Sequence, residues 1–215
     1  MSTNARILLR IVAGTMLSYP LAYLVNLPVL VPILNAVPAV PFMYLSLRNG
    51  RAREAVGRML LWAAVMAVCA TLLSYIRTTE TDRLFLNGER YRQEMFAWIR
   101  TGEGAESSPR LFLPVHAAHA ALFCALSIAS GSVLSMPMGA ILMNYMGHYV
   151  GALAALSRDP IHATLLAWNP WSLVRIVSFV ALGVVLAGPV FGRLGGFAFS
   201  LRSHTRLLAW PLPAC

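Results

Sequence analysis

Lysine is absent from the sequence, and all 17 of its basic residues are arginine. Charge of either sign is scarce as well: charged residues make up 12% of the chain, about half of what a soluble domain carries. No acidic or basic residue occurs between Arg10 and Arg48, or between Arg110 and Arg158. Each of these runs exceeds the roughly 20 residues that one helix needs to cross a bilayer core. The scarcity of charge excludes an ordinary soluble domain and predicts an integral membrane protein.

Cysteine is also rare, and the three that occur lack the spacing of a metal site or a disulfide framework. Cys69 and Cys124 lie inside apolar segments, and Cys215 lies in the C-terminal tail. We interpret them as small buried apolar side chains. The net charge of +9 is spread over arginines that flank apolar segments, without the single basic stripe of a nucleic-acid-binding surface. We therefore expect a lipid bilayer around the chain and no nucleic-acid partner.

The apolar segments predict an all-α fold, a polytopic membrane protein with about six transmembrane helices. We expect a single integral membrane domain over residues 1–215, with spans at 7–25, 28–47, 59–76, 111–134, 137–157 and 172–191. Asn26-Leu27-Pro28 is the best turn before Arg48, because a residue that precedes proline avoids the helical region. Residues 11–47 therefore form either two spans or one span and a re-entrant segment.

The polar residues concentrate in one outer loop, residues 77–110, which holds six arginines and six of the chain's eight acids. Asn87-Gly88 marks a turn within it. Glu89 to Arg100 follow as a short helix whose aromatic residues can share one face. We expect this amphipathic helix, between the third and fourth spans, to lie in the headgroup region.

The arginines near the span ends predict the orientation. With the N-terminus inside, the inside segments, which include the tail residues Arg193, Arg202 and Arg206, hold nine arginines and one acid. The outside segments hold eight arginines and seven acids. The inside arginines are concentrated in short segments, as the cytoplasmic side requires. We expect a multi-pass protein of the cell inner membrane with both termini in the cytoplasm.

Three histidines interrupt the fourth and fifth spans. His116 and His119 share a helical face, roughly 8 and 12 Å from the outer end of their span. His148 lies about 13 Å from the outer end of the fifth span, which a tight turn makes an antiparallel neighbour. Asn144 lies one turn further in. We expect the three imidazoles to converge in the outer half of the bilayer, where polar side chains are rare and mark function.

This cluster supports three functional hypotheses and one structural explanation. His116, His119 and His148 are candidate ligands of a zinc or copper ion. Glu94, His116 and Asn144 are candidate catalytic residues of an intramembrane hydrolase, in which Glu94 activates water and the other two bind an oxyanion. Alternatively, His148, Asn144 and nearby serines line a conduction or proton-relay path. In the structural explanation, the same side chains form ordinary hydrogen bonds between helices.

Two short patterns bear on these hypotheses. Phe112-x-x-x-His116 resembles one short motif of the CAAX-type intramembrane proteases, although the paired glutamates and the arginine of that family are absent. The fifth span carries a stripe of small residues, which lets helices pack closely; its members are Gly139, Gly147, Gly151 and Ala155. We expect such a stripe to face a partner in a homo-oligomer or a larger membrane complex.

The leading interpretation is an inner-membrane accessory, assembly or transport-related subunit. Such a protein acts through its helix surfaces and an outer-facing polar pocket. The alternative is a membrane-embedded enzyme, either an intramembrane hydrolase or a metal-dependent enzyme, that uses the glutamate, histidine and asparagine cluster.

Overall fold

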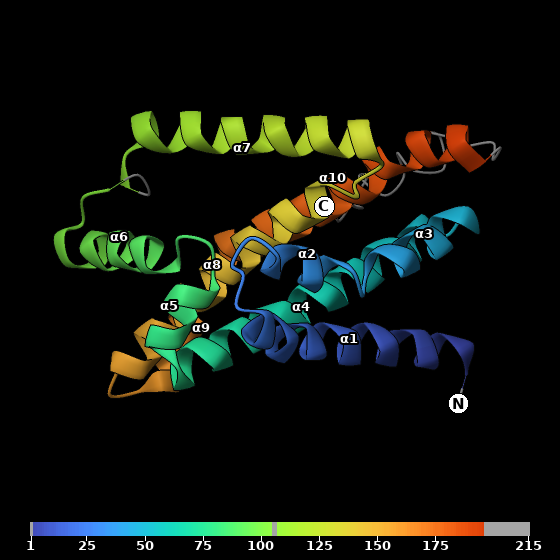
Figure 1. The fold of residues 1–215 in the computed structure, drawn as a ribbon. Coiled ribbons are helices and arrows are strands. Elements are labelled where there is room, and N and C mark those ends of the chain that lie inside the picture. The colour runs from blue at the N-terminus through green and yellow to red at the C-terminus, as the bar shows by residue number, and fades with distance from the viewer. Residues whose placement is uncertain (1, 105–106, 196–215) are drawn as a thin grey trace, which may run out of the picture.

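The computed structural model describes residues 2–104 and 107–195, and every regular element within these ranges is a helix (Figure 1). The predicted inside residues Arg202 and Arg206, like Cys215, lie outside the described residues. The helices are α1 (Thr3–Val25), α2 (Val31–Ala36), α3 (Val40–Arg48), α4 (Ala52–Ile76), α5 (Thr78–Leu84), α6 (Gly88–Thr101), α7 (Pro109–Ser130), α8 (Ser135–Leu156), α9 (Pro160–Ala167) and α10 (Pro170–Gly195). The prediction of an all-α polytopic membrane protein is confirmed.

In the part of the chain that the structure describes, five stretches are long and apolar enough to cross a membrane. They are Thr3–Val25, Val31–Arg48, Ala52–Ile76, Pro109–Ser130 and Pro170–Val190. The remaining predicted span is also a helix, α8, with 22 residues. It contains Asn144 and His148, and 13 of its residues are buried. The helix with these polar residues therefore lies inside the bundle.

The second predicted span is a broken helix. Asn26 ends α1 in the left-handed region, with φ of 51°, so the chain reverses at the predicted turn. α2 and α3 follow, separated by a turn at residues 37–39 around Pro38. Gly14 of α1 passes close to this break, because a Cβ at Gly14 would lie 2.8 Å from the Cβ of Pro38. Proline thus produces two short helices where one straight helix would otherwise run.

α4 and α8 share the most extensive helix contact of the described chain, and two glycines of α8 make it close. A Cβ at Gly147 would meet the Ala70 side chain, and a Cβ at Gly151 would meet the Thr71 carbonyl oxygen. Small residues let two helix backbones approach in this way. Two members of the small-residue stripe, Gly147 and Gly151, therefore pack inside the chain, whereas a Cβ at Gly139 would meet nothing within 4 Å. That the stripe faces a partner stays a prediction.

α5 and α6 form a helical hairpin that inserts into one end of the bundle, which we call the hairpin end. After α4 ends, α5 folds back so that Leu84 and Phe85 are each only 2% exposed. These two residues pack against Tyr19 of α1 and Val31 of α2. The tip of the hairpin thus occupies the space next to the start of the short helix α2.

α6 leaves the hairpin tip and runs alongside α8 in the same direction. Tyr91 stacks on Tyr145 with ring centroids 4.6 Å apart, and Phe96 meets Tyr149 edge-on at 6.5 Å. The predicted amphipathic helix is confirmed, and its aromatic face packs on α8. The expectation that α6 lies in the headgroup region stays a prediction, because its packing on α8 does not fix its depth in a membrane.

α7 lies at the edge of the bundle, beside α10 (Figure 1). Only two of its 22 residues, Phe123 and Ser127, are buried. The Phe123 ring meets Phe179 of α10 edge-on at 4.9 Å, and Ser132, just after α7, donates a hydrogen bond of 2.7 Å to the Gly183 carbonyl. These contacts hold α7 on the surface of the bundle.

Candidate functional site

His148 is fully buried between α4, α8 and the hairpin. Its Nδ1 lies 2.9 Å from the Ser74 hydroxyl of α4, and its Nε2 lies 2.8 Å from the Asp82 carboxylate of α5. Phe85 covers the imidazole edge-on, with ring centroids 5.7 Å apart. At 1.5 Å per residue, His148 lies about 12 Å from the hairpin end of α8. The hairpin therefore carries a carboxylate to a histidine deep in the bundle.

Asp82 also forms an ion pair with Arg92 of α6. The Arg92 Nε and Nη2 atoms donate to the two carboxylate oxygens at 2.8 and 2.7 Å, so the pair is bidentate, the strongest form of this contact. Burial alone raises the pKa of Asp82, but the hydrogen bonds from Arg92 and His148 outweigh it. The net effect is a pKa below the ordinary value, and Asp82 is a carboxylate at neutral pH.

We use the name hairpin cluster for the four side chains of Ser74, Asp82, Arg92 and His148. Their hydrogen bonds determine which nitrogen of His148 carries the proton. A carboxylate only accepts hydrogen bonds, so the His148 Nε2–H donates to Asp82. Nδ1 then accepts from the Ser74 hydroxyl. In this form the charges of Asp82 and Arg92 cancel and His148 is neutral. One more proton would leave an uncompensated positive charge, which burial opposes.

A second polar network, about one helical turn further along α8, joins three helices. Asn144 is 3% exposed. Its carbonyl oxygen accepts a hydrogen bond of 2.8 Å from the Tyr19 hydroxyl, and its amide donates to Asn35 at 2.8 Å. Asn35 in turn donates to the Ser18 hydroxyl at 2.7 Å. Because every member has a partner, this network stabilises the contact between α1, α2 and α8.

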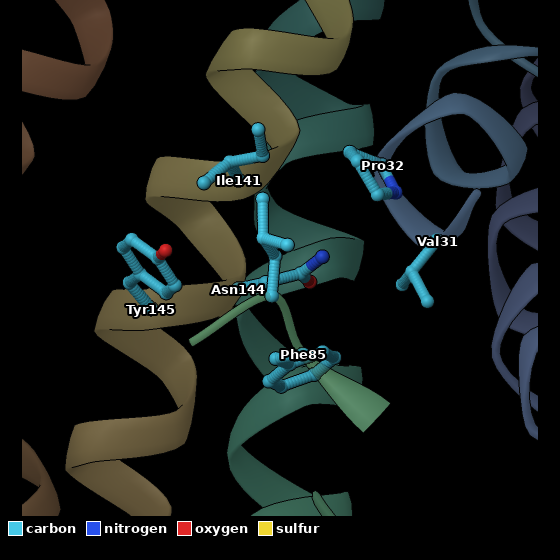
Figure 2. A pocket seen from close by; sticks show the side chains of 7 residues that line it. Val31, Pro32, Phe85, Ile141, Asn144 and Tyr145 are labelled. Carbon is cyan, nitrogen blue, oxygen red and sulfur yellow. The ribbon is translucent and has the colours of Figure 1, made fainter. Parts of the chain in front are cut away.

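A small pocket lies beside Asn144, where the hairpin tip meets α2 and α8 (Figure 2). Figure 2 shows the Asn144 side chain reaching from α8 towards α2, with Phe85 of the hairpin next to it. The pocket has a volume of about 10 Å³, close to the space that one water molecule needs. Its lining residues are Val31, Pro32, Phe85, Leu86, Ile141, Asn144 and Tyr145. The hairpin tip thus closes a pocket of the size of one water molecule.

The two histidines of α7 belong to a different place. The His116 Nε2 lies 2.7 Å from the Arg175 guanidinium of α10, and its Nδ1 lies 3.0 Å from the Phe112 carbonyl oxygen. The His119 ring lies 6.3 Å from that of His116. The expected convergence of the three imidazoles is not found, because α7 packs beside α10 while His148 faces α4 and the hairpin.

The ligand set expected for zinc or copper is therefore not assembled. Across residues 2–104 and 107–195, no group of three histidine, cysteine, aspartate or glutamate side chains is placed to hold a metal ion. The candidate ligands divide into His116 and His119 on one side and His148 on the other. The prediction of a metal site gains no support from their positions.

The candidate catalytic residues Glu94, His116 and Asn144 are also apart. Glu94 is exposed on α6, where its carboxylate lies 2.8 Å from the Arg90 Nε atom. His116 faces α10, and Asn144 lies in the buried network of α1 and α2. The structure does not bring the three to one site, because α6 turns its acidic face away from the bundle.

Ser74, His148 and Asp82 do form a hydrogen-bonded series of the residue types that nucleophilic hydrolases use. Ser74 and His148 are both fully buried, however. A Cβ at Gly151 would lie 2.8 Å from the Ser74 Cβ, so the helices close around the hydroxyl and leave no room for an acyl group. In this conformation the series orders the helices and holds one titratable group.

The sequence contains a signal for two members of the hairpin cluster, Asp82 and Arg92, that was not used in the prediction. Asp82 and Arg92 lie five residues before and five residues after Asn87, at the predicted turn. A turn there folds the two flanking segments together and pairs the opposite charges. Ser74 has no such signal, because its contact with His148 depends on how α4 and α8 pack.

The chain matches no protein-family model, no curated protein and no solved structure. The functional interpretation therefore rests on the described geometry.

Proposed function

We propose that this chain is a transport-related integral membrane protein in which the hairpin cluster binds and releases a proton. One observation carries the proposal: the hairpin holds the Asp82 and Arg92 ion pair against the fully buried His148. Ionisable side chains within transmembrane bundles are costly and occur mainly in ion paths and proton relays.

The backbone near the cluster supports the same role. The turn between α5 and α6, at residues 85–87, lies next to the pocket of Figure 2. The broken second span also begins beside this pocket, at Val31. Within a membrane, interrupted helices are tolerated where they are covered by protein or line a cavity, and transporters place binding sites at such breaks.

The net charge of the hairpin cluster explains how proton binding is coupled to movement of the hairpin. The hairpin cluster is neutral as described, and an added proton makes it positive. A buried positive charge without a counter-ion is unfavourable, so protonation favours an arrangement in which water reaches the cluster. The hairpin contacts His148 through Asp82 and Phe85, so its movement exposes His148 without separating α4 from α8. Proton binding is thus coupled to hairpin movement, which opens the pocket beside Asn144.

The location of the protein completes the proposal. The arginine distribution supports a multi-pass protein of the inner membrane with both termini in the cytoplasm. In this orientation the hairpin end faces outward, and the hairpin cluster takes its proton from the outer side.

Proton flux into proteoliposomes tests the function. The purified protein is reconstituted with a pH-sensitive dye inside the vesicles, and an inward proton gradient is applied. We expect flux with the wild type and at least a tenfold loss with His148→Gln and with Asp82→Asn. Glu94→Gln is the matched control, because it removes a charge from the exposed face of α6 and leaves the hairpin cluster intact. Equal flux in wild type, His148→Gln and protein-free vesicles would contradict the proposal.

A second candidate is an accessory or assembly subunit of a homo-oligomer or a larger membrane complex. The low burial of α7 favours it, since Leu122 and Ile128 are 51% and 58% exposed. In that case Leu122→Trp disrupts the oligomer in native mass spectrometry. Leu17→Trp on α1, where Leu17 is 66% exposed, is the control for an equally bulky change on another helix. If the wild type is monomeric in mild detergent, the proposal of a homo-oligomer is contradicted.

A further inference from the structure

Arg175, near the start of α10, is a cation without an acidic partner among the described residues. Its one hydrogen bond there runs from Nη1 to the His116 Nε2, at 2.7 Å. A guanidinium has five N–H donors, so most of its donors remain unused. The side chain is only partly exposed, and it lies about 8 Å along α10 from Pro170. A charge in this position requires a counter-ion.

His116 acts as a support for this guanidinium. Arginine only donates hydrogen bonds, so the His116 Nε2 must accept, and Nδ1 then carries the proton. Nδ1–H donates to the Phe112 carbonyl oxygen, at 3.0 Å. The Phe112 ring also stacks on the imidazole, with centroids 3.7 Å apart. Both nitrogens of the imidazole thus have a partner, and the ring positions Arg175. The His119 ring lies 6.3 Å from that of His116.

Exposed apolar side chains lie within one helical turn of His116 and Arg175. On α7, Leu113 and Val115 are 62% and 47% exposed, and on α10, Val174 is 57% exposed. Trp171, one turn before Arg175, is 69% exposed, and exposed tryptophan is typical of the level of the lipid headgroups. A cation at this level, between apolar helix surfaces, matches the structure of a lipid with one charged end.

We infer that Arg175, supported by His116, binds the phosphate of an anionic membrane lipid. The guanidinium fork fits two phosphate oxygens at once. The acyl chains of the same lipid lie along the exposed apolar residues of α7 and α10. The site is independent of the hairpin cluster, which neutralises its own arginine with Asp82.

Lipid binding to the purified protein tests the site. Native mass spectrometry in a mild detergent measures the affinity for phosphatidylglycerol, with phosphatidylcholine as the zwitterionic comparison. The wild type binds phosphatidylglycerol with clear preference, and Arg175→Gln weakens this binding tenfold or more, because a charged hydrogen-bond pair is lost. Arg158→Gln is the matched control, since Arg158 is an exposed arginine between α8 and α9, and it binds like the wild type.

Three results would overturn the inference. One is that Arg175→Gln binds phosphatidylglycerol as tightly as the wild type. Another is that Arg158→Gln loses as much affinity as Arg175→Gln, which would mean attraction by overall charge. The third is that inorganic phosphate at the same concentration protects the wild type from thermal unfolding as well as the lipid does, which would assign the site to free phosphate. If Arg175→Gln does not fold, Arg175→Lys, which retains the charge and loses the fork, replaces it and weakens binding several-fold.

Discussion

α7 and α8 follow one another in the chain, have 22 residues each and carry the intramembrane histidines, yet the bundle uses them in opposite ways. Thirteen residues of α8 are buried and only two of α7. α8 has glycines where it meets α4, so that its backbone can approach closely. α7 is joined to the bundle mainly through α10. The position of a helix is decided by how closely its neighbours can approach it.

The histidines of the two helices also have different hydrogen-bond partners. His148 of α8 has an acid and a hydroxyl as partners, both supplied by other helices. His116 of α7 has its own backbone and an arginine at the edge of the bundle. A polar side chain deep in a membrane protein needs partners from protein, so the helix with the more deeply placed polar residues becomes the central one. The following experiments test this difference.

The largest effect is expected where α8 touches α4. Gly151→Leu places a side chain against the Thr71 carbonyl oxygen and the Ser74 side chain. The two helices must separate, and overpacking of this kind costs up to about 3 kcal/mol and occasionally more. Gly139→Leu is the control on the same helix, because a Cβ there meets nothing within 4 Å. Unfolding by sodium dodecyl sulfate in mixed micelles measures both, and equal stability of the two variants would show that α8 is not held by close approach.

The next effect concerns the partners of His148. Asp82→Ala leaves Arg92 without its ion pair and His148 without its acceptor. Removing one member of a largely buried ion pair destabilises a protein by about 3 kcal/mol. Glu94→Ala breaks an exposed pair on α6 and leaves the unfolding curve unchanged. If both variants unfold alike, the hairpin cluster does not hold the hairpin in place.

The helices were predictable because each depends on local pattern. Asn26 and Asn87 mark turns that the structure places where the sequence predicts them, with φ of 51° and 54°. The sequence did not predict the break of the second span at Pro38, although the break itself is a local turn. Long uncharged runs predicted the spans for the same reason, since a helix satisfies its own backbone within one segment.

The partners of the histidines were not predictable, because they depend on packing between distant segments. The prediction that His116 and His148 converge treats the fourth and fifth spans as an isolated antiparallel pair. The sequence contains no simple signal that α7 packs beside α10, or that α5 folds back to bring Asp82 to His148. The glycines of α8 were recognised as a close-contact surface, but two of them, Gly147 and Gly151, pack on α4 of the same chain. Periodicity identifies such a surface without identifying what covers it.

Acid should loosen the hairpin by protonating Asp82. The pKa of Asp82 is lowered in the folded protein, so its stabilising contribution is complete above the ordinary value of 3.8 and is lost as the pH falls through the folded pKa. Hydrogen exchange, corrected for intrinsic rates, measures the opening of the backbone hydrogen bonds of α5 and α6 at pH 6 and pH 3. Faster exchange at pH 3 is expected in the wild type, and Asp82→Asn should show little additional change.

The smallest effect is expected for the loss of a single serine hydroxyl. Ser74 lies at the contact between α4 and α8, and Ser178 lies on α10 at the edge of the bundle. Ser74→Ala removes the hydroxyl that donates to His148, and a buried acceptor left without its donor costs about 1 kcal/mol. Ser178→Ala removes an exposed hydroxyl of α10 that bonds to the Val174 carbonyl of its own helix. That carbonyl also accepts the helical hydrogen bond, so stability should not change measurably. Unfolding in mixed micelles measures the stability of both variants. If Ser178→Ala loses as much stability as Ser74→Ala, the edge of the bundle depends on its polar contacts as much as α8 does.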